Sequence, residues 1–246
     1  ARAGPAPTMA ARTVTLGIVG GGAVGGGIVE ILGGKAAQLE ALGVDIKISK
    51  VCVRDPSKPR DFKLPQGCAV VGDAKAILDD PEVDIIVEVM GGTGLAKTIV
   101  ESALEKGKHV VTANKALIAQ ELPALEDLLD RVNKGRADDP VRFGYEAAVC
   151  GGIPIIHALQ RDFLGDDIVQ LNGIINGATN FILSNMEQGS KSYSDALAEA
   201  SELGYAEADP TLDVMGFDAR SKLRILAKLA FGVDVQEEEI PCRGIT

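Results

Sequence analysis

The sequence has few cysteines, no long apolar run and no excess of basic residues, and each shortage argues against a class of protein. Its four cysteines lie far apart without a CxxC pair, which argues against a zinc site or a disulfide framework and indicates reduced thiols. No apolar stretch approaches the roughly 20 residues that span a bilayer, so the protein is expected to be soluble. A net charge of −10, with basic residues dispersed among acids, argues against nucleic acid. A small-molecule partner is therefore favoured.

What is present is an ordinary globular composition, 46% hydrophobic and 24% charged. A length of 246 residues suits one large domain or two smaller ones. Residues 1–13, rich in alanine and free of acids, fit a flexible tail, and the remnant of a transit peptide is the alternative. We expect a cytoplasmic or plastid protein rather than a secreted one.

Short β-branched runs alternate with amphipathic stretches from residue 14 onward. This rhythm of strand, helix and strand predicts a parallel sheet with crossover helices, so 14–149 is expected to be a Rossmann-like α/β domain. Strands are expected at VTLGIV (14–19), IKISKVCV (46–53), AVV (69–71), VDIIVEV (83–89), KHVVTA (108–113) and VRFGYEAAV (141–149).

The rhythm changes near residue 150. A strand is expected there over 167–176 and helices over 153–164, 180–188, 194–203 and 217–231. The change predicts a second, α+β domain over 150–246, which would bind substrate and carry catalytic residues.

A glycine-rich turn follows the first expected strand directly. Its GxGxxG spacing permits a tight turn, close approach of the backbone to a pyrophosphate, and packing of a helix on the sheet. The phosphates would meet free amides at the N-terminus of that helix. A glycine-rich loop without a ligand is the alternative, but the βα context favours a dinucleotide. The candidate cofactor residues are Gly20, Gly22, Ala23, Val24 and Gly25 in this turn, with Gly91 and Thr93 after the fourth expected strand.

Arg54 stands at the end of the second expected strand, where this fold usually places an acid on the adenine ribose. Arginine can pair with a 2′-phosphate, so NADP is favoured over NAD. If Arg54 is merely solvated, Asp55 beside it could bind a ribose hydroxyl, and NAD stays possible.

An acid and a lysine share one face of a helix predicted over 213–232. At about 100° per residue, Asp218 and Lys222 lie on the stripe that continues as Ile225 and Leu229. The opposite, solvated face is expected to carry Arg220, Arg224 and Lys228. Such a pair is usually a surface ion pair, but facing a cleft it could be a general acid with its orienting carboxylate. Both interpretations stand at this point.

The segment before this helix, ELGYAEADPTLD (202–213), is rich in acids around a proline. Acid-rich turns are usually solvated caps. Glu207, Asp209 or Asp213 could instead supply a carboxylate to a substrate ammonium, which an apolar wall could not hold.

Six ordered blocks of the sequence closely resemble the homoserine dehydrogenase family, over essentially the whole chain after Thr13. They are GIVGGGAVG (17–25), VEVMGG (87–92), GKHVVTANKAL (107–117), YEAAVCGGIPII (145–156), GIINGATNFIL (173–183) and ELGYAEADPTLDVMGFDARSKL (202–223). The resemblance implies an NAD(P)-dependent oxidoreductase that interconverts L-homoserine and L-aspartate 4-semialdehyde in the biosynthesis of threonine, methionine and isoleucine. It also implies a homodimer.

The resemblance assigns roles to individual residues. Lys222 would give and take the proton at the substrate oxygen, assisted by Asp218. Glu207 would bind the amino group of homoserine, with Asp213 nearby. Lys115 matches a family lysine at the junction of nicotinamide and substrate, and so counts among both the catalytic and the cofactor residues.

Two further blocks carry implied binding residues. The YEAAVCGGI segment matches a monovalent-cation loop, and its candidate sodium ligands are Glu146, Val149, Gly151 and Ile153. The family commonly has two hydroxyl residues in its NGTTN-like block. Here Ala178 replaces the first, so Thr179 alone is expected at the substrate pocket.

The family chain normally continues well past residue 246, so this chain is expected to be a truncated piece. The alternative function is then a fragment that binds cofactor or promotes oligomerisation without turnover. A semialdehyde dehydrogenase that works through a thioester is disfavoured, because that route needs a Cys–His nucleophile pair, which is absent.

Overall fold

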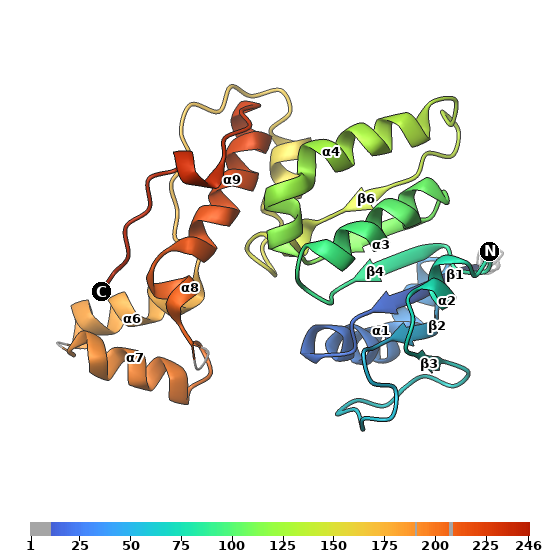
Figure 1. Ribbon diagram of the computed structural model, residues 1–246, viewed down its shortest axis with the longest axis horizontal. Coiled ribbons are helices and arrows are strands. Elements are labelled where there is room, and N and C mark those ends of the chain that lie inside the picture. The colour runs from blue at the N-terminus through green and yellow to red at the C-terminus, as the bar shows by residue number, and fades with distance from the viewer. Residues whose placement is uncertain (1–10, 190, 207–208) are drawn as a thin grey trace, which may run out of the picture. The chain divides into compact units, whose positions relative to one another are not determined.

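The computed structural model describes residues 11–189, 191–206 and 209–246 (Figure 1). The chain divides into two compact units. The first unit takes in Ala1–Asn114 and Ala124–Gly144, and the second takes in Lys115–Pro123 and Tyr145–Thr246. Among the described residues, no helix combines the length and the apolar character needed to cross a membrane.

The first unit is built on a six-stranded sheet in which all neighbouring strands pair in parallel. The order β3-β2-β1-β4-β5-β6 reverses direction between β1 and β4, which confirms the Rossmann-like prediction. In such sheets, ligands bind outside the carboxyl ends of the strands at this reversal. The strands are β1 (Arg12–Val19), β2 (Val44–Cys52), β3 (Ala69–Val71), β4 (Ile85–Glu88), β5 (His109–Thr112) and β6 (Phe143–Gly144).

Helices connect these strands as crossovers. They are α1 (Ala23–Ala41), α2 (Lys75–Leu78), α3 (Gly94–Glu105) and α4 (Lys115–Asn133). The crossover from β1 to β2 runs one way along the sheet, whereas those after β4 and β5 run the other way. Because parallel crossovers are right-handed, α1 covers one face of the sheet while α3 and α4 lie over the other (Figure 1). Ile18, Val51 and Val87 from the strands pack with Val29 of α1 in the core.

Two expected strands differ from the structure. The strand predicted over 141–149 is confined to Phe143–Gly144, and a 3-10 turn at Glu146–Ala148 follows it. The strand predicted over 167–176 does not form. That segment is mostly exposed and is not paired with any described strand. Alternating apolar residues favour an extended chain, but a strand also needs a neighbour to satisfy its backbone groups.

The described part of the second unit is helical, coloured yellow to red in Figure 1 beyond Tyr145. The helices predicted over 180–188, 194–203 and 217–231 are confirmed by α6, α7 and α9, and the helix predicted over 153–164 corresponds to α5 and the π-helical turn η2. The elements are α5 (Ile155–His157), η2 (Ala158–Asp162), α6 (Gly177–Gly189), α7 (Tyr193–Glu202), α8 (Thr211–Val214), α9 (Phe217–Phe231) and the 3-10 turn η3 (Glu237–Glu239).

The single helix predicted over 213–232 is wrong, because the chain breaks between α8 and α9. Gly216 adopts a left-handed conformation with φ of 83°, which ends helical hydrogen bonding and turns the chain. The expected stop at Gly232 is confirmed, since its φ is 68°. The break makes Asp218 a first-turn residue of α9 rather than a mid-helix residue.

Candidate functional site

The glycine-rich turn lies between β1 and α1, and each of its three motif glycines meets a different steric demand. Gly20 has φ of 117°, and a Cβ there would lie 2.5 Å from the carbonyl oxygen of Val89. A Cβ on Gly25 would collide with the carbonyl oxygen of Gly20. Gly22 faces open space, with no atom within 4 Å of such a Cβ. These are the tight turn, the close helix packing and the room for a ligand that a dinucleotide turn requires.

The N-terminus of α1 suits an anion. The helix begins at Ala23 after Gly22, which makes no side-chain capping bond, and its first turn contains no acid. The first backbone N–H groups of a helix lack partners within the helix, and the helix dipole favours negative charge there. Ala23, Val24 and Gly25 therefore present amides suited to a pyrophosphate.

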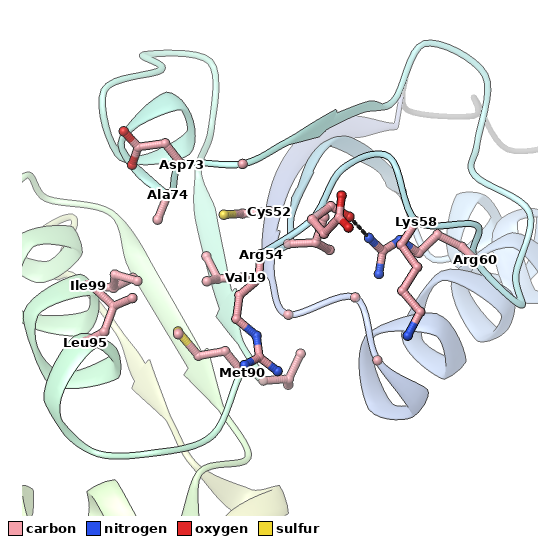
Figure 2. Close-up of a pocket in the computed structure, with 17 residues that line it drawn as sticks. Val19, Cys52, Arg54, Lys58, Arg60, Asp73, Ala74, Met90, Leu95 and Ile99 are labelled. Carbon is pink, nitrogen blue, oxygen red and sulfur yellow. Dashed lines mark hydrogen bonds between the residues drawn. The ribbon is translucent and has the colours of Figure 1, made fainter.

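A cavity of about 660 Å³ opens next to this turn, at the carboxyl ends of β1, β2 and β4 (Figure 2). Its volume falls within the range of small-molecule and cofactor pockets. Gly20, Gly21 and Gly22 form part of its lining, while Met90 and Leu95 add apolar surface. Gly91 and Thr93 are not among the lining residues, although both lie in the loop between β4 and α3 that contributes Met90 to the lining.

Three basic side chains, Arg54, Lys58 and Arg60, line this cavity around the loop after β2 (Figure 2). Arg60 donates a hydrogen bond to the backbone carbonyl of Asp55, which fixes this loop. Arg54 is exposed and has no hydrogen-bond or ion-pair partner among the described residues. The loop thus offers a guanidinium to the cavity.

Asp55 is engaged within its own turn. Its carboxylate accepts hydrogen bonds from the Ser57 hydroxyl at 2.6 Å and from the Ser57 backbone N–H at 2.9 Å. These hydrogen bonds, the hydroxyl one first, hold the pKa of Asp55 below its ordinary value. Only one of its two oxygens is engaged by Ser57, so Asp55 adds a negative charge to the cavity lining beside the three basic side chains.

The acid–lysine pair of α9 lies at the centre of a cluster of charged and polar side chains in the second unit. Asp218 is only 4% exposed, and its Oδ2 lies 2.6 Å from the Nζ of Lys222. Lys115 of α4 binds the other oxygen, Oδ1, in a second ion pair. Lys222 also donates to the carbonyl of Ile175 at 2.8 Å. The pair is therefore not the surface ion pair that its spacing usually indicates.

The carboxylate of Asp218 remains ionised despite its burial. Desolvation is the largest influence and would raise its pKa, but hydrogen bonds from Lys115, Lys222 and Asn176 together hold the pKa below its ordinary value. An ammonium has three N–H donors, and Lys222 uses two in the contacts above. Its third donor is suited to a substrate oxygen.

Asn176 joins the cluster and was not predicted as a site residue. Its side-chain amide donates to Asp213 at 2.7 Å and to Asp218 at 2.9 Å. Its carbonyl oxygen accepts from both the backbone N–H of Thr179 at 2.8 Å and the Thr179 hydroxyl at 2.9 Å. Asn176 thus caps α6 and links three predicted positions. An asparagine just before a helix is a recognisable cap signal, but the cap alone does not indicate its acidic partners.

The other predicted substrate residues are distributed as follows. Asp213 and Thr179 are brought together by Asn176, as described above. Ala178, where the family has a hydroxyl, is buried in the apolar cluster of α6 and α7 with Ile182 and Ala196. Glu207 lies outside the described residues.

The predicted cation loop contains a carboxylate that already has backbone partners. Glu146 accepts hydrogen bonds from the backbone N–H groups of Ile156 at 3.0 Å and His157 at 2.8 Å, which caps α5. The carbonyl of Ile153 accepts from Ile155 at 2.8 Å. Within the described ranges, no group of three acidic, histidine or cysteine side chains could hold a metal ion. Any cation here would rely mainly on backbone carbonyls, such as those of Val149 and Gly151.

The face of α9 expected to be solvated is instead largely covered. Arg224 is 7% exposed and lies 3.6 Å from Asp234, and Arg220 pairs with Glu237 at 3.2 Å. Glu237 also accepts from Ser221 at 2.7 Å. The prediction of a wet face was wrong for Arg224, because helix periodicity does not reveal that the chain after Gly232 folds back over α9.

A cofactor-sized cavity at the reversal of a parallel sheet and a buried carboxylate that holds two lysines are the main features of the candidate sites. Such features are typical of the class of nucleotide-binding folds in which the sheet edge binds a cofactor.

The comparisons with known proteins identify the family. The family model "Homoserine dehydrogenase, NAD binding domain" matches residues 20–138, and the model "Homoserine dehydrogenase" matches 154–246. The homoserine dehydrogenase of Corynebacterium glutamicum is 41% identical over 234 residues, which cover 95% of this chain and 51% of that protein. The chain belongs to the homoserine dehydrogenase family.

Solved structures agree with this. A homoserine dehydrogenase from Thiobacillus denitrificans superposes with a TM-score of 0.85 at 40% identity, over 96% of this chain and 53% of that one. A hyperthermophilic archaeal homoserine dehydrogenase in complex with NADPH gives a TM-score of 0.74 at 26% identity, over 94% and 75%. The chain spans about half the length of the curated relatives it matches.

Proposed function

We propose that this chain carries the cofactor-binding and catalytic residues of an oxidoreductase that interconverts L-homoserine and L-aspartate 4-semialdehyde. The observation that carries the proposal is Asp218, a buried carboxylate that binds the ammonium groups of both Lys115 and Lys222. Oxidation of an alcohol requires a group that accepts its proton, and reduction of the aldehyde requires the same group as a donor. Lys222 fits this need.

The proposed cofactor is NADP, and NAD is its alternative. The open space at Gly22 and the free amides of α1 fit a pyrophosphate, and Arg54 and Lys58 in the cavity lining suit a 2′-phosphate. The relative solved with NADPH supports the same cofactor. When bound, the nicotinamide would accept or donate the hydride.

The two lysines are proposed to act at the substrate oxygen: Lys222 transfers its proton, and Lys115 stabilises its negative charge. In oxidation Lys222 would act as the neutral amine, which takes the hydroxyl proton and becomes an ammonium; in reduction the ammonium returns that proton to the oxygen, while Asp218 fixes its position. The ammonium of Lys115, bound to the other oxygen of the same carboxylate, adds a second positive charge for the developing alkoxide. Acid–base assistance of this kind contributes about 10²–10⁴-fold to the rate.

The remaining assignments concern the substrate and an ion. Glu207 is proposed to bind the substrate ammonium, with Asp213 and Thr179 nearby. Sodium is proposed at the loop of Glu146, Val149, Gly151 and Ile153, where carbonyl oxygens suit a hard cation. Dimerisation through the second unit is part of the same proposal.

One experiment separates turnover from binding alone. The chain is incubated with L-homoserine and NADP while the absorbance of reduced nicotinamide is followed, and NADPH binding is measured separately by its fluorescence. L-Serine, which is one carbon shorter, serves as the control substrate. Turnover of homoserine alone supports the proposed function. Binding without turnover would support the alternative, a fragment that binds cofactor or promotes oligomerisation without turnover. Absence of binding would contradict the proposed function and the cofactor-binding form of the alternative.

A further inference from the structure

Glu88, the last residue of β4, is a buried acid that neither site uses. Its exposed fraction is 0%, and it is the most deeply buried ionisable side chain among those described. Burying a carboxylate is unfavourable unless hydrogen bonds replace its hydration. Glu88 therefore needs hydrogen-bond donors that compensate for the lost hydration of its carboxylate. The residues that supply these donors indicate its role.

The partners of Glu88 come from the loop after β4 and from the end of β5. Its Oε1 accepts the backbone N–H of Met90 at 2.9 Å, and its Oε2 accepts the hydroxyl of Thr112 at 2.6 Å. The oxygen of Thr112 in turn accepts the backbone N–H of Asn114 at 3.0 Å. The Asn114 side chain donates to the carbonyl of Gly92 at 2.6 Å, which closes a ring. The ring joins the loop after β4 to the turn after β5.

Both joined segments lead to predicted site residues. The loop after β4 contributes Val89 and Met90 to the cavity lining. It continues through Gly91 and Gly92, whose φ values of 74° and 73° are left-handed conformations that glycine adopts without strain. The turn after β5 ends at Asn114, directly before Lys115 in the chain. One carboxylate therefore restrains both the loop beside the cavity and the residue before Lys115.

We propose that Glu88 is a positioning residue that keeps the loop after β4 and the turn before Lys115 in register. The inference rests on the proposed function for the roles of the cofactor and of Lys115. Reacting groups must be held within a small distance of their productive geometry, and a misplacement of about 1 Å can cost about 10²-fold in rate. Thr112 transmits the effect of Glu88, because its hydroxyl donates to the carboxylate and accepts from Asn114.

Four variants test this proposal. Thr112→Val keeps the shape of the side chain but removes the link between Glu88 and Asn114, while Thr112→Ser restores the hydroxyl. Glu88→Gln tests the carboxylate itself. The matched control is Lys108→Met, directly before the start of β5, because Lys108 is also buried and its ammonium donates to two carbonyls, those of Asp80 at 2.6 Å and Val83 at 2.7 Å.

Hydrogen exchange resolved by residue, without cofactor, measures the link directly. Relative to Lys108→Met, the amides of Met90 and Asn114 should exchange about tenfold faster or more in Thr112→Val and in Glu88→Gln, after correction for the global unfolding measured for each variant. Thr112→Ser should return to within about twofold of the parent chain. Equal exchange at these amides in Thr112→Val and Lys108→Met would overturn the proposal.

Cofactor and rate measurements then separate positioning from plain stability. The Kd for NADPH should rise about tenfold in Thr112→Val and kcat should fall further, while Lys108→Met should change neither by more than about twofold. A loss of melting temperature in both variants without this split would show that the ring is only structural. A parent chain that fails to bind NADPH would refute the proposed function, whereas the exchange result would still decide the role of Glu88.

Discussion

The two candidate sites of this protein are built in opposite ways. The glycine turn between β1 and α1 depends on the absence of side chains. A Cβ at Gly20 or Gly25 would collide with the backbone, and a Cβ at Gly22 would occupy open space beside the cavity. The cluster around Asp218 acts through charged and polar side chains from α4, from α9 and from Asn176, which caps α6. A backbone site of adjacent residues should be sensitive to added volume. A side-chain site assembled from distant segments should be sensitive to lost charge.

Loss of charge at Lys222 should have the largest effect. Lys222→Ala removes the proposed proton donor, so kcat should fall about 10²–10⁴-fold while the affinity for NADPH stays nearly unchanged. Lys228→Ala, on the same helix, is the control and should keep its rate. Thermal unfolding of the variant is measured as well. The variant should still fold, because Asp218 keeps two other hydrogen-bond donors. Near-normal turnover by a folded Lys222→Ala variant would show that Asp218 and Lys222 form only an ordinary ion pair.

Added volume in the glycine turn should divide into two effects. Gly25→Ala forces a methyl against the carbonyl oxygen of Gly20, so both the melting temperature and NADPH binding should drop. Gly22→Ala meets no protein atom within 4 Å, so it should fold normally yet weaken NADPH binding about 10–10²-fold by occupying ligand space. Calorimetric titration and thermal unfolding of both variants check this. Unchanged NADPH binding by Gly22→Ala would show that the pyrophosphate does not bind at this turn.

The stability of the protein should depend on pH through Asp218. Because its folded pKa is lowered, the unfolded chain binds the proton more readily, and the stabilisation is present above the unfolded pKa of about 3.9. It is lost as pH falls through the lower, folded pKa. Urea unfolding of the parent and of Asp218→Asn should therefore show a stability difference that favours the parent near pH 6 and shrinks toward pH 3. A difference that grows toward low pH would reverse the assigned sign.

The smallest effect is expected at Arg54, at the rim of the first site. Arg54→Ala should raise KM for NADP several-fold and leave KM for NAD nearly unchanged, because a 2′-phosphate contact is lost. Lys58 and Arg60 line the same cavity and should limit the loss. Steady-state kinetics with both cofactors test this. An equal change with NADP and NAD would place Arg54 away from the 2′-phosphate.

The same contrast explains how far the sequence could predict the structure. The first five strands, the glycine turn and the end of α9 at Gly232 follow from local patterns, and the facing of Asp218 and Lys222 follows from helix arithmetic. The roles of Asn176 and Glu88 do not, because their partners lie far away in the sequence: Asp218 is 42 positions beyond Asn176 and Thr112 is 24 beyond Glu88.

The errors have the same origin. Arg224 was expected in solvent because helix periodicity describes one helix and not the chain that returns over it. The helix over 213–232 was expected to be continuous because one glycine inside a helical pattern does not reveal a left-handed φ. The segment 167–176 was expected to be a strand because alternation does not supply a partner.

The most direct test of the account is the titration of the Asp218 carboxyl, followed by ¹³C NMR in the parent chain and in Asn176→Ala and Lys222→Met. Hydrogen bonds from Lys115, Lys222 and Asn176 keep the buried carboxylate of Asp218 ionised, so its pKa should lie below the ordinary value of about 3.9 in the parent chain. Each variant lacks one of these donors and should therefore show a higher pKa. An Asp218 that titrates at or above its ordinary value in the parent chain, unmoved by either substitution, would contradict this expectation.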